Sequence, residues 1–448
     1  MSLKKSLNLS DAILLVIGNT IGAGIFTTSG FLASELQEPL LFICIWILGG
    51  FITLCGALTY AELAGMFPFA GGDYHFLKAA YGRGAGFLLG WVSFWIIVPG
   101  SIAALSIALI NFLKIFISFY NPVQEKLLAI LIIFLFSLIN YRGIRLSCIT
   151  QNVFTIGTII ILMTLILCGF FSGKGNWNNF TNTSPLSSNY SNLFSSAMIA
   201  VIFTYSGWFA SAYIGSEIRN SERNLPLSLI LGTLFLASIY TLINIVYLYS
   251  LPIHKLKNMI NVAQIAFGNL FNPTVTKVVS LPIILAISGS INATILTGAR
   301  IFYAMAEDGI FWPILSRVHP LYQTPHYAIL SQTILACILV LLGTFNQLLS
   351  YVVFVMLFSS IATGVALFVL RRLKPNFHRL YHTMGYPFVP LLFVVSYIWI
   401  AVQICYSKPT TSILGIFITF SGVPFYIWCK YKKKVPIQQP FQNHKSYL

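Results

Sequence analysis

The sequence predicts an all-α polytopic membrane protein with about twelve transmembrane helices, and three observations support this. Of its 448 residues, 57% are hydrophobic and only 8% are charged, which is too few charges for the surface of a soluble globule of this size. Apolar stretches long enough to cross a bilayer as helices recur along the whole chain. Lys4 and Lys5 precede a full-length apolar stretch without a clear cleavage site, so no cleavable signal sequence is expected.

The loops between the apolar stretches are too short to hold a soluble domain. We therefore expect a single transmembrane domain over residues 1–430 and a basic cytoplasmic tail over 431–448. The expected spans are 9–33, 39–66, 83–113, 124–140, 144–171, 193–217, 226–250, 274–305, 326–343, 346–370, 386–406 and 410–430. An even number of spans agrees with both ends of the chain lying on the same side of the membrane.

The chain carries a net charge of +16, with 26 Lys and Arg residues against 10 Asp and Glu residues. With the spans above, most of these basic residues and every Arg fall on the side that holds both termini. The positive-inside rule then places both termini in the cytoplasm. The excess of basic over acidic residues therefore reflects membrane topology and contact with anionic lipid, and no nucleic-acid site is expected.

The first span contains an interruption at residues 18–26, Gly-Asn-Thr-Ile-Gly-Ala-Gly-Ile-Phe. Gly22 and Gly24 are poor helix formers, so the helix can open there at modest cost. Opening frees backbone N–H groups from Ala23 to Phe26 at the positive end of a second half-helix, which suits a carboxylate. The residues leave two interpretations open, a carboxylate site that lines a cavity or a glycine-rich face for close helix packing.

A second interruption falls in the sixth span, at residues 202–211, where Thr204, Ser206 and Gly207 interrupt an apolar run. It follows the first by five spans, so the sixth helix starts from the opposite side of the membrane to the first. Two interrupted helices at matching positions of antiparallel halves indicate an inverted-repeat transporter. The first half of helix 6 would end in free carbonyl oxygens that suit an ammonium group. Together the two breaks predict a site for a zwitterion, that is, an amino acid.

Several long, ordered stretches within spans 1 to 10 also match a known pattern. They are residues 18–30; 57–63 with Pro68, Gly71, Gly72, Asp73 and Tyr74; 87–99; 203–208 with Glu217, Arg219, Asn220, Arg223, Asn224 and Pro226; and 299–300 with 304–306 and 308–309. In these stretches the chain resembles the amino acid–polyamine–organocation superfamily of permeases, nearest its L-type amino acid transporter branch. The resemblance implies a five-plus-five inverted repeat of the leucine-transporter type with helices 1 and 6 broken. Repeat one would cover about 9–171, repeat two about 193–370, and two appended helices about 386–430.

The resemblance also implies that the two breaks bind the substrate, with its carboxylate at the first break and its amine at backbone oxygens of the second. The implied site residues are Ile21, Gly22, Ala23, Gly24, Ile202, Phe203, Tyr205, Gly207 and Trp208. Phe203 matches the family's gating aromatic, whose apolar face would close over the substrate and exclude water. A core aromatic is the alternative interpretation of Phe203.

Three departures from the family pattern bear on the substrate and the coupling ion. Ala23 stands where the family often has Ser, and Phe209 where the L-type branch tends to have Asn. No acid lies at the centre of spans 1, 3, 6, 8 or 10, so a cationic side chain would lack a counter-ion there. We therefore expect a neutral, apolar or aromatic substrate. Many relatives place a Lys where this chain has Gly157 and Thr158, which leaves the coupling ion open.

Other polar residues are candidates for a gate or an ion site. Glu62 lies near the inner end of span 2 and is either functional or paired with a basic residue at a cytoplasmic gate. Arg300 and Glu217 are candidates for such pairing. In span 8, Ser288 and Ser290 lie in a polar cluster, which coordinates sodium or only bonds across helices; Thr158 is a further ion-site candidate.

These features favour secondary active transport of amino acids by alternating access, through exchange or proton-linked uptake. The alternatives are a sodium-coupled symporter, a cationic amino acid or polyamine antiporter, and a non-transporting sensor or channel of the same fold. No nucleotide-binding loop or catalytic constellation is present, so an enzyme is not expected, nor a cofactor. The seven cysteines lack metal-ligand spacing, and the loop after span 3 has no Cys for a disulfide-linked heavy chain. Together with the compact loops, this favours a bacterial inner membrane.

Overall fold

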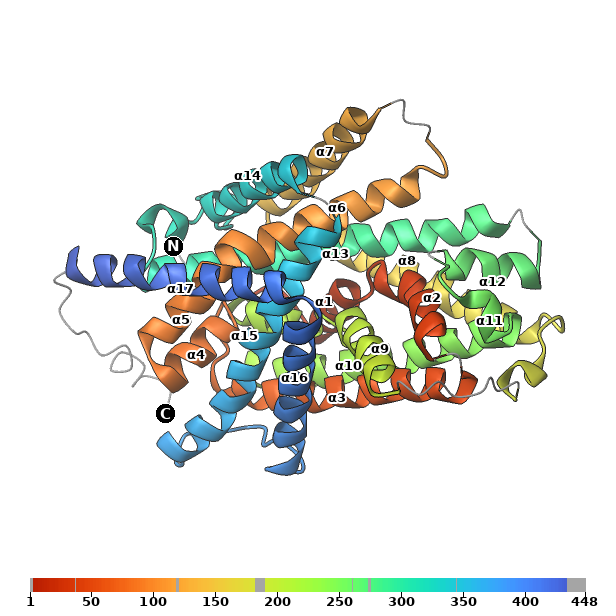
Figure 1. Cartoon of the computed structure of the whole chain (residues 1–448). Coiled ribbons are helices and arrows are strands. Elements are labelled where there is room, and N and C mark those ends of the chain that lie inside the picture. Colours follow the sequence, from red (N-terminus) through yellow and green to blue (C-terminus); the bar gives the residue numbers. More distant parts are fainter. Residues whose placement is uncertain are drawn as a thin grey trace.

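The computed structural model describes residues 3–36, 38–117, 121–181, 190–259, 261–272, 275–343 and 345–432. Helices occupy most of these ranges, and two isolated β-bridges join Leu7 to Ile218 and Ala70 to Ile214. Figure 1 shows a bundle in which many of the long helices run side by side. The predicted basic tail lies outside the described residues from 433 onward.

The elements follow one another without a separate soluble unit among the described residues. In order they are α1 (Leu9–Thr20), α2 (Gly24–Leu36), α3 (Pro39–Met66), α4 (Asp73–Tyr81), α5 (Arg83–Val92), the π-helical turn η1 (Ser93–Ile97), α6 (Val98–Leu113), α7 (Pro122–Tyr141), α8 (Ile144–Phe171), η2 (Trp177–Phe180), α9 (Tyr190–Thr204), η3 (Ala210–Tyr213), η4 (Gly215–Glu217), α10 (Ser221–Ser250), α11 (Ile253–Leu256), α12 (Val262–Leu270), α13 (Val275–Glu307), η5 (Pro313–Ser316), α14 (His326–Leu342), α15 (Phe345–Leu373), α16 (Phe388–Ser407) and α17 (Pro409–Lys432).

Within the described ranges, nine helices are long and apolar enough to cross a membrane, and the bent pair α1–α2 makes a tenth. Two shorter apolar helices, Leu193–Thr204 and His326–Leu342, occupy the positions expected for spans six and nine. The elements therefore match the twelve expected spans in order, which confirms the all-α polytopic prediction. The five-plus-five repeat stays a prediction.

Several spans begin at residues that satisfy free N–H groups of the first helical turn. The backbone N–H of Asn8 donates to the Asp11 carboxylate at 2.9 Å at the start of α1. Glu38 accepts from the N–H of Leu41 at 2.8 Å at the start of α3. Asn121 accepts from the N–H of Gln124 at 3.0 Å before α7. Local sequence thus sets where these three spans start.

The first break lies where the glycine-rich stretch predicts it. Helix α1 ends at Thr20, and α2 begins at Gly24 with its axis bent by 42° from that of α1. The N–H of Ile21 still bonds to the carbonyl of Ile17 at 2.9 Å, so the helix opens only after that residue. Three non-helical residues therefore separate the two half-helices.

The second break is more extensive than the sequence analysis expected. Helix α9 ends at Thr204, and the short 3-10 turns η3 and η4 take the place of a second α-helical half. Gly207 adopts a φ of +101°, a left-handed conformation that glycine adopts without steric cost. The expected span 193–217 is thus a short helix followed by a chain of turns.

The two breaks lie against each other. The Asn19 amide donates to the carbonyl of Gly207 at 3.0 Å, and the hydroxyls of Thr28 and Thr204 lie 2.8 Å apart. Tyr240, on α10, donates to the carbonyl of Thr20 at 3.0 Å and lies 3.4 Å from that of Thr204. Neither segment runs as one continuous helix, so the physical premise of the transporter prediction holds.

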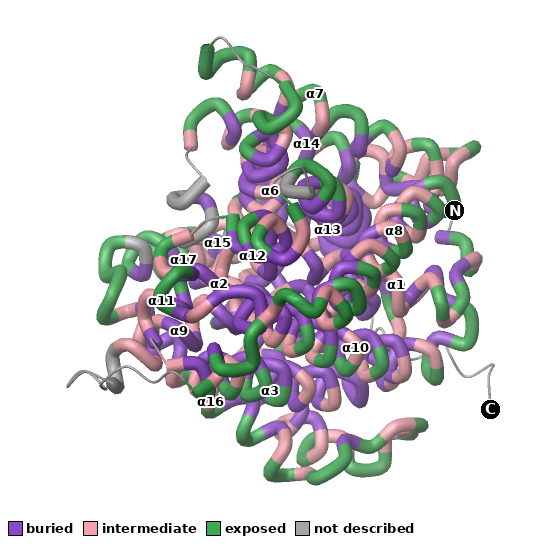
Figure 2. The backbone as a smooth tube through the Cα atoms, turned by 90° about the vertical axis from the view of Figure 1, so that its right-hand side faces the viewer, coloured by how far each residue is buried: buried purple, intermediate pink, exposed green. Residues whose placement is uncertain are grey.

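The remaining helices enclose the broken pair. Helix α10 packs along α3, and α13 packs against both α6 and α8. Figure 2 shows the buried positions in the interior of the bundle and the exposed ones on outer faces such as those of α7 and α16. On α7, Leu127, Leu131, Phe134 and Leu138 form an exposed stripe at helical spacing. Such an apolar exterior suits contact with lipid.

Candidate functional site

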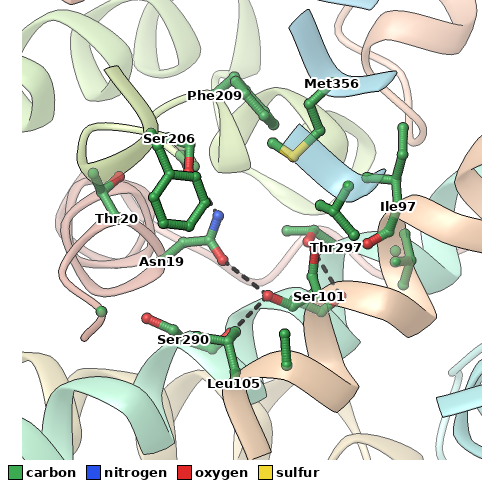
Figure 3. Close-up of a pocket in the computed structure, with 18 of the residues that line it drawn as sticks. Asn19, Thr20, Ile97, Ser101, Leu105, Ser206, Phe209, Ser290, Thr297 and Met356 are labelled. Carbon is green, nitrogen blue, oxygen red and sulfur yellow. Dashed lines mark hydrogen bonds between the residues drawn. The ribbon is translucent and has the colours of Figure 1, made fainter. Parts of the chain in front are cut away.

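A cavity of about 300 Å³ lies where the two breaks meet α6, α13 and α15. Gly22, Ala23 and Gly24 line it from the first break, and Phe203 and Gly207 from the second. Figure 3 shows Asn19, Ser290, Thr297 and Met356 gathered around the same space. Five of the nine predicted substrate-binding residues therefore share one cavity.

Main-chain polarity differs between the two sides of this cavity. The start of α2 presents N–H groups that lack intrahelical partners, beginning at Gly24. At the end of α9, the last carbonyls lie beyond the reach of helical donors, although that of Phe203 accepts from the N–H of Ser206 at 2.9 Å and that of Thr204 lies 3.4 Å from the Tyr240 hydroxyl. A half-helix N-terminus carries partial positive charge and a C-terminus partial negative charge. The arrangement can hold a carboxylate and an ammonium group of one small molecule.

The other four predicted site residues turn away from this cavity. Tyr205 is buried, and its hydroxyl donates to the carbonyl of Trp46 at 3.1 Å. Ile202 and Trp208 line a smaller pocket beside α16, which Phe203 also borders. Ile21 is buried, and its carbonyl accepts from Ser290 at 3.1 Å. Their side chains thus support the breaks, while any contact with a ligand falls to their main chain.

Phe203 is half-buried and lines both the main cavity and the smaller pocket. It follows Ile202 in the last turn of α9, just before the second break begins. This position puts a large apolar ring beside the free main-chain groups. The geometry suits the gating role that the resemblance implies.

The three ion-site candidates do not share one cavity. Ser290 lines the main cavity and donates to the carbonyls of Gly18 and Ile21, both at 3.1 Å. Thr158 borders a separate small gap beside the same two residues, and its hydroxyl donates to the carbonyl of Phe154 at 2.8 Å. Ser288 is buried and lines neither space. Thr158 and Ser290 therefore flank the end of α1 from two helices.

Asp73 is a cavity residue that the sequence analysis missed. It is the first residue of α4, and it is buried although α4 lies in a loop between two spans. Its Oδ2 atom accepts from the hydroxyls of Tyr213 at 2.9 Å and Tyr60 at 3.3 Å. Burial raises its pKa to about 7, against the lowering effect of these hydroxyl groups. The expectation that no acid lies at the centre of spans 1, 3, 6, 8 or 10 did not cover this loop, so Asp73 was not considered as a cavity residue.

Gly71 and Gly72 explain how the loop delivers this acid. Both have positive φ, +106° and +47°, and an added Cβ on Gly72 would lie 2.9 Å from the Tyr213 ring. The N–H of Gly71 also donates to the carbonyl of Tyr213 at 2.9 Å. The glycine pair before an acid is a local signal that the chain approaches another segment closely.

Ion pairs gather at the end of the bundle that holds the start of α4. Glu62 accepts from Arg371 at 2.9 and 2.6 Å and from the N–H of Thr383 at 2.7 Å. Arg300 donates to Glu217 at 2.9 and 3.1 Å, and both side chains are buried. Glu62 is therefore paired with a base, as one interpretation expected, but Arg300 pairs with Glu217 and not with Glu62.

The first described residues of the chain join this end of the bundle. The N–H groups of Ser6 and Leu7 donate to the carbonyl of Glu217 at 2.9 and 3.0 Å, and the N–H of Arg219 donates to that of Leu7 at 2.8 Å. Lys78 and Tyr74 both contact the carboxylate of Asp308 nearby. These contacts tie the N-terminal segment to the last turn of the second break.

Comparison with known proteins gives a consistent result. A family model described as "Amino acid permease" matches residues 7–428. The serine/threonine exchanger SteT of Bacillus subtilis (strain 168) is 31% identical over 434 residues, covering 96% of this chain and 98% of that protein. The human b(0,+)-type amino acid transporter 1 is 28% identical over 456 residues, covering 100% and 93%. The human large neutral amino acids transporter small subunit 2 is 27% identical over 447 residues, covering 97% and 82%.

Proposed function

The chain belongs to the amino acid permease family, and from that premise we propose that it exchanges neutral amino acids across a membrane by alternating access. The observation that carries the mechanism is the contact between the two breaks, with Asn19 bonded to Gly207 at 3.0 Å beside a cavity. It is a transporter and not an enzyme, as its family and relatives are.

We place the substrate's carboxylate at the N–H groups that follow Gly22, at the start of α2. Its ammonium group faces the carbonyls at the end of α9, near Ile202 and Phe203. Opposite partial charges at the two half-helix ends support this orientation. Phe203 then closes over the bound amino acid, while the broken segments move against α6, α7, α13 and α14.

The substrate's side chain extends into a space with both apolar and hydroxyl-bearing walls. Leu105 and Met356 contribute apolar surface, and Ser101 and Thr297 contribute hydroxyl groups. Asp73 is the one acidic side chain among the described residues that line the cavity, and burial raises its pKa to about 7, so it carries only part of a negative charge near neutral pH. These features support a neutral substrate over a basic one, with the apolar or aromatic preference open to the test below.

The test is exchange in proteoliposomes with radiolabelled leucine outside and one unlabelled amino acid inside. An exchanger takes up label only when the lumen holds a substrate, and protein-free liposomes set the background. Leucine, phenylalanine, serine and threonine inside should support uptake, whereas arginine and putrescine should not. If vesicles without internal amino acid take up leucine when an inward proton or sodium gradient is imposed, the protein is a symporter and the exchange proposal is wrong. A stronger response to arginine or putrescine than to leucine would overturn the neutral substrate.

The membrane orientation is a further part of the proposal. The clustering of every Arg on one side supports placing both termini in the cytoplasm, and the relative in Bacillus subtilis supports a bacterial inner membrane. The loop after α6 contains no Cys, so we expect function without a disulfide-linked heavy chain. Reporter fusions at each terminus test the orientation, and a periplasmic signal from either one would contradict it.

A further inference from the structure

Asp73 is a buried acid whose two carboxylate oxygens are in different situations. Oδ2 accepts from two tyrosine hydroxyls, but Oδ1 has no hydrogen-bond partner within the described part of the chain. The residue is 2% exposed and lines the cavity. An ionised carboxylate with an unsatisfied oxygen is costly away from water. The position therefore calls for a positive charge or a proton at Oδ1.

No cation is placed to meet that oxygen from the elements that pack against α4. The titratable groups that face Asp73 are Tyr60 on α3 and Tyr213 on η3, with Tyr397 on α16 behind Tyr60. On α15 the nearest group is the hydroxyl of Thr363, which acts on Asp73 as a hydrogen-bond donor and lowers its pKa against the larger effect of burial.

The basic residues of the neighbouring segments are engaged or exposed. On α13, Arg300 is bound to Glu217, and on α4 itself Lys78 is bound to Asp308. Arg83, at the start of α5, is exposed. His75, two residues along α4, has its pKa lowered to about 4 by burial, so it is neutral near pH 7. None of these described residues supplies a positive charge to Asp73, and a proton can neutralise it.

We propose that Asp73 is a proton-binding site at one end of the substrate cavity, occupied in the described conformation and emptied when the second broken segment moves away. Tyr213 belongs to that segment, so its movement separates the hydroxyl from the carboxylate and admits water. The exposed carboxylate then releases its proton to solvent. The link to movement rests on the alternating-access proposal above, whereas the proton site does not.

The direction of the pH effect follows from linkage. The described conformation binds the proton more tightly than one with Asp73 in water, whose carboxyl has its ordinary pKa of about 3.9. Acid therefore favours the described conformation. As pH rises from about 4 to about 7, the ratio of this conformation to the exposed one falls by up to about tenfold per pH unit. Above about pH 7, both forms are ionised and the ratio is constant.

Infrared spectroscopy of the protein in lipid nanodiscs tests the site without any substrate. With only ten Asp and Glu residues, the carbonyl band of one protonated acid is resolvable. We expect this band to disappear with a midpoint near pH 7, to be absent in Asp73→Asn and to remain in Glu125→Gln, a control at a surface ion pair. Tyr213→Phe removes a donor that lowers the pKa, so its midpoint should rise, and it reports on the site if Asp73→Asn fails to fold.

Leucine exchange at equal pH on both sides tests the link to movement. The wild-type rate should change between pH 5.5 and 7 and be level above, whereas Asp73→Asn should be insensitive to pH. A wild-type protein with no band that titrates between pH 5.5 and 8.5, or a band that persists in Asp73→Asn, overturns the proton site. A titrating band with pH-independent exchange overturns the link to movement. If the infrared band titrates but neither the wild type nor the variants exchange amino acids, the proposed function is wrong and the proton site is retained.

Discussion

Replacement of Gly207 by alanine tests whether the contact between the two breaks holds the site together. Its φ of +101° lies in the left-handed region, and an added Cβ would lie 2.8 Å from both the amide nitrogen and the backbone oxygen of Asn19. One of these atoms belongs to the main chain and cannot rotate away. Relief of the clash would also disturb the 3.0 Å hydrogen bond from Asn19 to the Gly207 carbonyl.

Gly82 offers a matched control on the same chain. Its φ is +92°, and among the described residues no atom lies within 4 Å of an added Cβ. Both alanine variants carry backbone strain, because both glycines have positive φ and Gly82, with ψ 176°, lies in a region essentially restricted to glycine; such strain costs about 1–3 kcal/mol. Only Gly207→Ala adds the clash and the loss of a hydrogen bond, together about 1–3 kcal/mol. We expect Gly207→Ala to be less stable than Gly82→Ala by that difference.

Two measurements compare Gly207→Ala with Gly82→Ala. Thermal unfolding of the purified variants in detergent compares their stability, and leucine exchange in proteoliposomes at equal protein density compares their activity. If about 1.4 kcal/mol of this destabilisation raises the energy barrier to exchange because the second break is displaced, the exchange rate falls about tenfold. If Gly207→Ala unfolds together with Gly82→Ala and exchanges at the same rate, the reasoning is refuted.

Three further variants test other parts of the site. Phe203→Ala should sharply reduce leucine exchange per inserted transporter, whereas Phe358→Ala on the exposed face of α15 should not; equal rates would argue against the gate. Arg300→Ala leaves the buried Glu217 carboxylate unpaired and should lower the free energy of unfolding by about 3–5 kcal/mol, which thermal unfolding measures. Lys114→Ala, at an exposed ion pair, should lower it by less than about 1 kcal/mol. Similar losses in the two variants would contradict the argument that the buried pair matters more. Ser290→Ala removes one hydroxyl hydrogen that is shared between two carbonyls at the end of α1. Loss of this shared bond, worth about 1–1.5 kcal/mol, should slow exchange by up to about tenfold; an unchanged rate would show that Ser290 is not needed to hold that end in place.

Local chemistry made the first break predictable. Gly22 and Gly24 weaken the helix where they stand, so the interruption could be located from the sequence. The order of the spans follows from hydropathy alone. Such features need no knowledge of the rest of the chain, which is why sequence reasoning reached them.

Contacts between distant segments explain what was missed. Asp73 accepts a hydrogen bond from Tyr213, which lies 140 residues away in the sequence. Glu62 pairs with Arg371, 309 residues away, and with Arg379, and nothing in the sequence near Glu62 identifies these partners. The turns that follow Gly207 replace an expected half-helix because they pack against Asn19 and α10. A pattern of residue types carries no such pairings.

The hydrogen bonds between the first described residues and the segment after η4 bear on where a fusion protein can be attached. Ser6 and Leu7 are hydrogen-bonded to Glu217 and Arg219, and Leu7 forms a parallel β-bridge with Ile218. If the second broken segment moves as proposed, we expect the N-terminal segment to move with it. We therefore expect a fluorescent protein or an affinity tag fused to the N-terminus to slow amino acid exchange.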